Sequence, residues 1–257
     1  MMETREKPLY LIRLFLDSRS LFRLSERKEV FARQLDLGYL VHCRLAALFG
    51  RVRPQPFAIT RTIGPWLEVL AYSESDHKTL FREVPRSMLP TIGAGVRWED
   101  FSSKKMPDLF PAGHRVSFRL RACPVERKAR GNSRVRMGAE VDVFLAALDR
   151  CPDKKLDRYQ VYCSWLKEKM ETDGAVECLE VKVVGYRRSM FVRRNKSRDF
   201  TTLERPDVTY QGQIAIRNPE AFKYLLARGI GRHRAFGFGM LLLSPAGRQN
   251  VVRTIGS

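Results

Sequence analysis

Along the first half of the chain, apolar and polar residues occur in short runs that predict strands, separated by segments with helical spacing. Runs rich in leucine, valine and aromatic residues end at turn residues, for example at Gly64-Pro65, as is typical of strands. The predicted strands are 9–16, 57–61, 66–72 and 115–123. The predicted helices are 25–49, in which Gly38 marks a break or a fresh start after Asp36, and 76–84.

The second half of the chain shows a similar succession after a basic stretch over 126–136, which is predicted to be a loop. The helices predicted from apolar spacing and capping residues are 141–148, 159–170 and 218–228. The predicted strands are 176–186, 189–194, 208–216 and 240–243. The first two of these strands are expected to form a hairpin with Arg187-Arg188 at its tip.

Each half therefore approximates the order strand, helix, two strands, helix and strand, which is that of a ferredoxin-like (RRM-like) domain. We expect an α+β protein made of two tandem ferredoxin-like domains, one over residues 1–124 and one over residues 125–257. A chain of 257 residues is long enough for two small domains that each bury a core. Two such units side by side suit RNA binding.

A glycine-rich loop follows the last predicted helix, which Asn218 and Pro219 are expected to begin. Its four glycines are Gly229, Gly231, Gly237 and Gly239. Dinucleotide-binding and P-loop motifs have a strand before the glycines and a helix after them, so the reverse order here excludes both. Glycines allow the main chain to approach a bulky anionic ligand closely, whereas the alternative is a simple hairpin turn.

Composition adds a prediction about the partner. The formal net charge is +19, with 47 Lys and Arg against 28 Asp and Glu, which favours a polyanion such as nucleic acid. Apolar stretches fall far short of the roughly 18 residues that span a membrane, so we expect no membrane partner and a cytoplasmic location. The five scattered cysteines predict neither a zinc site nor a disulfide framework, and we expect no metal and no cofactor.

Basic residues gather in two places that are candidates for RNA binding. The predicted hairpin carries six cations and no acid between its first and last, namely Arg187, Arg188, Arg193, Arg194, Lys196 and Arg198. The glycine-rich loop adds Arg232, His233 and Arg234. Such side chains contact phosphates and supply affinity and orientation, although a solvated charged hairpin is the alternative. His233 is interpreted as a second acid or base, a phosphate donor or a solvated loop residue.

Several blocks occur in a characteristic order. They are Tyr39-Leu-Val-His42 followed by Leu48-Phe49, a strand ending in Phe118-Arg-Leu-Arg-Ala-Cys-Pro124, a helix ending in Gly229-Ile-Gly231, and the block 237–245. In this order and spacing the chain resembles the CasE family of CRISPR repeat-processing endoribonucleases. Extra charged segments around 74–112, 126–157 and 187–205 are similar to additions in divergent repeat-processing relatives of type IV CRISPR systems.

The resemblance implies metal-independent cleavage of precursor CRISPR RNA within its repeat. The ribose 2′-OH attacks the adjacent phosphate and leaves a 2′,3′-cyclic phosphate, and the protein retains the mature RNA stem-loop alongside other CRISPR effector subunits. Two alternatives remain, which are a non-catalytic RNA-binding subunit of a CRISPR effector and a general RNA-binding protein.

The residue types suit this chemistry, because imidazole titrates near neutral pH and can move the proton that cleavage requires. Tyr39 and His42 lie three residues apart on one predicted helix face, and His42 lies at the rim of the apolar stripe. The alternatives are a rim histidine bonded to a backbone carbonyl and a tyrosine that only packs. Arg23, Arg44 or the loop arginines could instead carry more of the chemistry.

Overall fold

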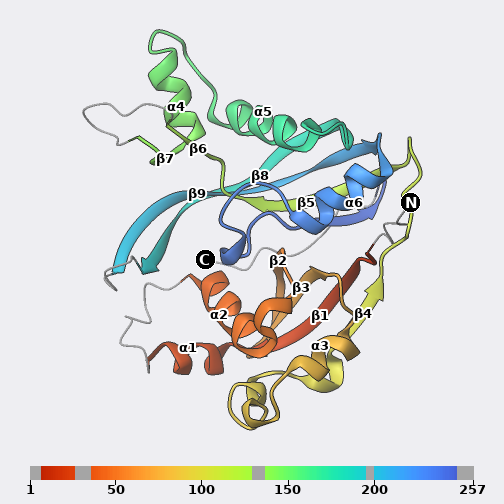
Figure 1. Ribbon diagram of the computed structural model, residues 1–257. Coiled ribbons are helices and arrows are strands. Elements are labelled where there is room, and N and C mark those ends of the chain that lie inside the picture. Colours follow the sequence, from red (N-terminus) through yellow and green to blue (C-terminus); the bar gives the residue numbers. More distant parts are fainter. Residues whose placement is uncertain (1–6, 27–35, 129–136, 195–199, 248–257) are drawn as a thin grey trace.

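The computed structural model of the protein describes residues 7–26, 36–128, 137–194 and 200–247. These residues form two units, one with strands β1 to β4 and one with strands β5 to β10, stacked one above the other (Figure 1). None of the helices in the described part of the chain is both long and apolar enough to cross a membrane.

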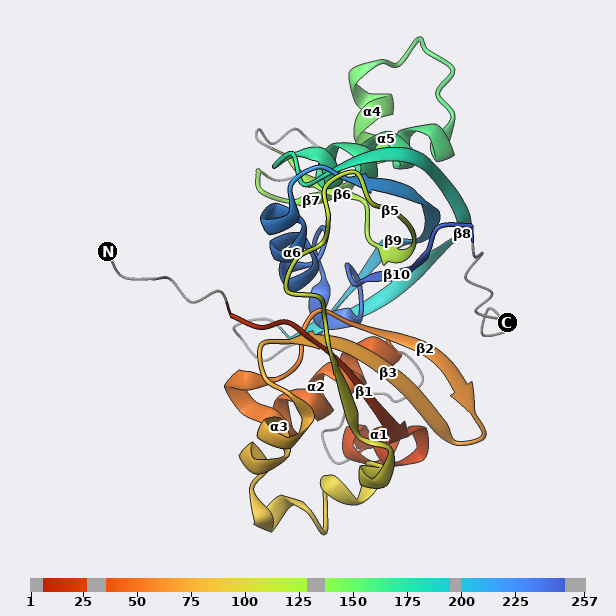
Figure 2. The same cartoon turned by 90° about the vertical axis from the view of Figure 1, so that its right-hand side faces the viewer.

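The first unit is a four-stranded sheet in the order β2-β3-β1-β4, with its helices gathered on one face (Figure 2). Its strands are β1 (Tyr10–Asp17), β2 (Phe57–Ile63), β3 (Trp66–Ser73) and β4 (Ser102–Lys105). Its α-helices are α1 (Ser18–Glu26), α2 (Leu37–Phe49) and α3 (His77–Glu83). Four short 3-10 turns are η2 (Gly50–Val52), η3 (Arg86–Met88), η4 (Gly93–Gly95) and η5 (Trp98–Asp100).

The second unit is a four-stranded sheet in the order β10-β5-β9-β8. Its strands are β5 (Arg115–Ala122), β8 (Val176–Arg194), β9 (Phe200–Ile216) and β10 (Leu241–Pro245). Its helices are α4 (Val143–Arg150), α5 (Arg158–Glu171) and α6 (Pro219–Arg228), with a 3-10 turn η6 (Arg234–Phe236). A separate two-stranded ribbon joins β6 (Val125–Arg127) to β7 (Glu140–Asp142).

In both sheets the first and third strands of the unit are central and the second and fourth lie at the edges, which is the order of a ferredoxin-like domain. This order confirms the predicted α+β class and tandem ferredoxin-like fold. The division of strands between the units differs from the prediction. Strand β5, expected to close the first unit, pairs with β9 and β10 of the second sheet, and β4 completes the first. A division at residue 124 therefore separates β5 from the rest of its own sheet.

The predicted hairpin turn at Arg187-Arg188 is wrong, because β8 runs on through both residues to Arg194. In the ladder, Arg187 lies opposite Asp207 and Arg188 opposite Pro206. Their side chains form ion pairs with acids on β9, 2.7 Å from Arg187 Nε to Asp207 Oδ2 and 3.0 Å from Arg188 Nη2 to Glu204 Oε2. Cross-strand pairs of opposite charge stabilise a ladder, so two adjacent arginines need not mark a turn.

Capping residues account for the helix bounds. Asp36 accepts a hydrogen bond from the backbone N–H of Tyr39 and starts α2 at Leu37, as the predicted fresh start after Asp36 requires. Asn218 accepts from Ala221 N–H and starts α6, and Gly229 ends it with a φ of 72°. Of the helix predicted over 25–49, the structure shows the end of α1 (Ser18–Glu26) and the whole of α2, and residues 27–35 lie outside the described residues.

The two units share a buried junction. The even-numbered positions of β5 pack with α5 and α6 in one cluster that also contains Ala58 and Tyr72 of the first sheet. The hydroxyl of Tyr72 is buried and donates to the carbonyl of Leu241 at 3.0 Å, so β3 and β10 are directly linked. The odd-numbered positions of β5 face the opposite way because strand side chains alternate.

Candidate functional site

Helix α2 places Tyr39 and His42 together, with ring centroids 6.4 Å apart. This three-residue spacing brings side chains to one helix face. His42 is half-buried, and its burial, with a smaller contribution from nearby Arg53, lowers the pKa of its imidazole from the ordinary value of 6.5. His42 is therefore predominantly neutral at neutral pH and can accept a proton.

The glycine loop, residues 229–239, lies against α2 at the junction of the two units (Figures 1 and 2). The Tyr39 ring stacks on the Phe236 ring with centroids 5.3 Å apart. Gly38 makes this approach possible, because a Cβ there would collide with the carbonyl oxygen of Phe236. Gly38 therefore lies at the start of α2 and also allows α2 to contact the glycine loop.

The four glycines of the loop all have positive φ, between 72° and 84°. Their missing side chains leave room for the protein itself. A Cβ on Gly229 would lie 2.9 Å from the Gly239 carbonyl oxygen, and one on Gly231 would lie 3.1 Å from the Trp165 ring. One on Gly237 would lie 3.2 Å from the Phe57 ring. These glycines are required by the loop's own packing, and contact with a ligand through them stays a prediction.

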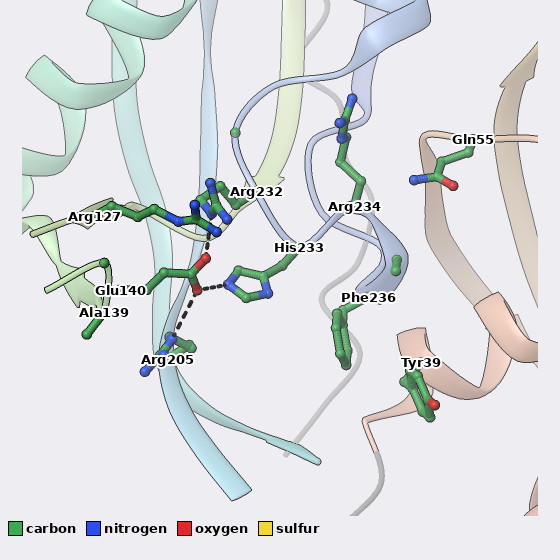
Figure 3. Close-up of a pocket in the computed structure, with 13 residues that line it drawn as sticks. Tyr39, Gln55, Arg127, Ala139, Glu140, Arg205, Arg232, His233, Arg234 and Phe236 are labelled. Carbon is green, nitrogen blue, oxygen red and sulfur yellow. Dashed lines mark hydrogen bonds and ion pairs between the residues drawn. The ribbon is translucent and has the colours of Figure 1, made fainter. Parts of the chain in front are cut away.

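A cavity of about 740 Å³, here called the central cavity, opens between α2, the glycine loop and the β6–β7 ribbon (Figure 3). Its lining includes four arginines, one histidine and one carboxylate, which are Arg127, Arg205, Arg232, Arg234, His233 and Glu140. Tyr39 and Phe236 close the side nearest α2. The lining therefore carries a clear excess of positive charge.

Glu140 is the centre of this charge cluster (Figure 3). Its Oε2 lies 2.7 Å from His233 Nε2 and 3.8 Å from Arg205 Nε, and its Oε1 accepts from Arg232 Nε. The hydrogen bond from His233, together with the bond and charge of Arg232, outweighs burial and lowers the pKa of Glu140 to about 2. The carboxylate is therefore ionised at neutral pH.

His233 is not the solvated loop residue that was one interpretation of the sequence, because its side chain is 16% exposed and bonded to Glu140. Among the described residues it is the one non-glycine with positive φ, at 61°. Its ring meets Phe236 edge-on at 5.9 Å, so Phe236 lies between His233 and Tyr39 (Figure 3). A strained backbone of this kind persists only where surrounding contacts hold it.

A second cavity of about 340 Å³, the side cavity, shares Gln55 with the central cavity. Arg51 and Arg53 line it, and Arg53 is the cation that lowers the pKa of His42. Basic side chains therefore line both of the cavities that share Gln55.

The predicted basic hairpin is only partly described. Arg187 and Arg188 are paired with acids of β9, while their side chains remain 69% and 54% exposed. Arg193 and Arg194 continue the ladder opposite Thr201 and Phe200. Lys196 and Arg198 lie outside the described residues.

Arg44 cannot carry chemistry on a ligand, because its guanidinium is buried and donates to Ile92 O and Ser20 Oγ. Burial lowers its pKa to about 10. Arg23 lies in α1, and its side chain is not among those described. Within the described ranges no three histidine, cysteine or acidic side chains are grouped to hold a metal ion.

Several residues of this site carried no recognisable sequence signal. Glu140, Arg205 and Phe236 are far from Tyr39 in sequence, and only the stacking of the two units brings them together. Hydroxyl, neutral imidazole and arginine groups beside an electropositive cavity can transfer protons and stabilise phosphate charge without a metal.

A family model described as "CRISPR associated protein" matches residues 9–245 of this chain. A structure of the CRISPR endoribonuclease Cse3 bound to a 19-nucleotide RNA is similar, with a TM-score of 0.61, 23% identity and coverage of 93% of this chain and 100% of that one. Thermus thermophilus Cse3 bound to an RNA representing a pre-cleavage complex has a TM-score of 0.58, 20% identity and coverage of 93% and 100%.

Cas6e from Escherichia coli K-12, a CRISPR-associated protein, has a TM-score of 0.57, 20% identity and coverage of 92% of this chain and 99% of that one. No curated protein sequence matches the chain. At these identities, the structural similarities establish a shared fold over nearly the whole of both chains.

Proposed function

Because this chain belongs to the family of CRISPR-associated proteins, we propose that it is a metal-independent endoribonuclease that cleaves precursor CRISPR RNA within the repeat. One observation carries the proposal. Tyr39 and His42 share a face of α2, and Tyr39 stacks on Phe236 at the edge of a cavity with excess positive charge. The arrangement puts Tyr39 at a surface suited to bind anions, with the His42 imidazole stacked next to the Tyr39 ring.

In the proposed reaction, neutral His42 takes the proton of the ribose 2′-OH while that oxygen attacks the adjacent phosphorus. The bond from phosphorus to the 5′-oxygen breaks, the departing 5′-oxygen takes a proton from water, and the products end in a 2′,3′-cyclic phosphate and a 5′-OH. Protonated His42 then returns its proton to the solvent, which restores the neutral imidazole. The Tyr39 hydroxyl is assigned a hydrogen bond to the reacting phosphate group. General base catalysis of this kind contributes on the order of 10² to 10⁴ in rate.

Binding is assigned to the arginines of the central cavity and to the exposed arginines of β8. Arg232 and Arg234 supply phosphate contacts beside α2, and Arg187 and Arg188 extend them along β8. Arg51 and Arg53 carry positive charge into the side cavity. Contacts at so many phosphates fit a cytoplasmic enzyme that keeps its RNA product in a complex with other CRISPR effector subunits.

The proposal is tested by incubating the protein with its cognate repeat RNA in EDTA and analysing the product ends. We expect a cut at one position and a 2′,3′-cyclic phosphate. Two RNAs serve as controls, a scrambled hairpin of equal length and a repeat with 2′-deoxyribose at the cleaved nucleotide, and neither should be cut. Tight repeat binding without cleavage would instead identify a non-catalytic subunit, and equal binding of repeat and scrambled hairpin a general RNA-binding protein.

A further inference from the structure

Arg121 of β5 connects elements of both units at the junction. Its Nε and Nη2 each donate to a carboxylate oxygen of Asp207 on β9 at 2.8 Å. Its Nη1 donates to the Phe236 carbonyl at 3.4 Å, and its Nη2 lies 3.6 Å from Asp36 Oδ2. The guanidinium also lies 4.2 Å from the centre of the Phe238 ring. One side chain thus contacts β9, the glycine loop and the residue that begins α2.

Each carboxylate partner of Arg121 has a second task. Asp36 accepts the backbone N–H of Tyr39 and thereby sets the first turn of α2. Asp207 is 3% exposed and also accepts Arg187 Nε at 2.7 Å and Ser189 Oγ at 2.9 Å, both from β8. A continuous chain of charged contacts therefore runs from exposed Arg187 through Asp207 and Arg121 to the start of α2.

The two carboxylates that bind Arg121 have pKa values shifted in opposite directions. Burial alone would raise the pKa of Asp207, but the bonds from Arg121 and the charge of Arg187 hold it below its usual value. Burial raises the pKa of Asp36, against the lowering effect of Arg121 and with a further raise from Asp207. The Arg121–Asp36 contact, at 3.6 Å, is also longer than the two Arg121–Asp207 bonds at 2.8 Å. Asp36 can therefore be neutralised without removing the bidentate Arg121–Asp207 pair.

We propose that Arg121 is a positioning residue. Through Asp207 it fixes α2 and Phe236 relative to β8, the strand to which RNA binding is assigned. This inference rests on the function proposed above, in which Tyr39 and His42 act on the phosphate that β8 and the glycine loop bind. Correct placement matters because a displacement of about 1 Å in an active site can cost roughly 100-fold in rate. Arg121 itself touches no reacting group and contributes through the elements that it holds.

The most selective test is Asp36→Asn. Asparagine caps a helix as well as aspartate does, so α2 and the thermal midpoint should be preserved while the charge toward Arg121 is lost. We expect the single-turnover rate to fall about 10-fold or more, within the range that misplacement produces, with repeat affinity unchanged. Arg121→Lys keeps the charge but not the fork geometry and should show the same selective loss. The matched control is Arg115→Met, which removes an exposed cation from the same strand and should leave the rate unchanged.

The imidazole NMR signals of His42, with exposed His114 as internal reference, give a readout that needs no cleavage. In Asp36→Asn they should shift while those of His114 do not. If the wild type binds the repeat but never cuts it, the proposed function fails, whereas the NMR shift still tests the positioning role. Wild-type rates and His42 signals in Asp36→Asn would overturn the inference. So would a variant in which rate, affinity and thermal midpoint fall together, because that marks a purely structural contact.

Discussion

The two sides of the junction each present an imidazole, in opposite electrical surroundings. His42 on α2 is half-buried and near Arg53, and both influences lower its pKa. His233 on the glycine loop is bonded to Glu140, an ionised carboxylate that also binds Arg232. The aromatic rings of Tyr39 and Phe236 lie between them. A neutral imidazole suits proton transfer, whereas the His233 imidazole is already bonded to the Glu140 carboxylate.

The two regions therefore have different roles in the proposed reaction. The α2 side offers a proton acceptor and a hydroxyl, while the loop side offers fixed cations around one acid. Variants on the α2 side should therefore change rate with little change in affinity, and variants on the loop side should change affinity first.

The largest effect is expected for His42→Ala. Loss of the general base should slow single-turnover cleavage by roughly 10² to 10⁴ with repeat affinity nearly unchanged. The rate is measured with enzyme in excess, and His114→Ala, which changes an exposed histidine, is the control. A wild-type rate in His42→Ala would remove the α2 side from the chemistry.

The loop side is tested by Arg232→Ala with Arg234→Ala. Removing these two cations should weaken repeat binding and reduce the slope of log K against log salt by roughly 0.7 to 0.9 per lost phosphate contact. Binding is measured over a salt series. An unchanged slope, with the protein still folded, would show that these arginines serve only Glu140 and the Arg228 carbonyl, to which Arg234 donates.

Gly38→Ala tests the contact that joins the two regions. The added methyl group would overlap the Phe236 carbonyl oxygen, so α2 and the loop must separate, at a cost of about 1 to 3 kcal/mol in the free energy of unfolding. Chemical denaturation measures this cost. Gly185→Ala is the control, because a Cβ there would make only ordinary contacts with Thr209. Equal stability of both variants would mean that the helix and the loop are not in contact.

The smallest effect concerns Glu140 and acid pH. The folded pKa of about 2 lies below the ordinary 4.5, so ionised Glu140 stabilises the fold fully above that ordinary value. The contribution is lost as the pH falls through the folded pKa. The difference in unfolding free energy between wild type and Glu140→Gln should thus shrink between about pH 5 and pH 2. A pH-independent difference would contradict the ion-pair account.

Local patterns predicted much of this molecule, whereas contacts between distant segments were not predictable. The caps at Asp36 and Asn218 and the Tyr39–His42 pair depend on neighbouring residues, and the sequence indicated them. Glu140 reaches His233 across 93 positions and Arg121 reaches Asp207 across 86, so no local pattern identifies either pair. The unit to which β5 belongs is likewise decided by its partners β9 and β10.

The glycine loop shows how one pattern supports two interpretations. Its four glycines predicted a close approach to a ligand, and the described contacts account for them through packing on Trp165, Phe57 and the loop itself. The arginines between the glycines line the central cavity. Charge in this loop is therefore a better guide to binding than its glycines are.

The central claim, that His42 supplies the proton transfer, is tested most directly by chemical rescue. Imidazole added to His42→Ala should restore cleavage of the repeat in a saturable way, because it can replace the missing base at the vacated position. The same addition should leave the Arg232→Ala and Arg234→Ala double variant unimproved. A His42→Ala protein that folds and binds the repeat like wild type, yet is not restored by imidazole at any pH where imidazole is neutral, would contradict the account.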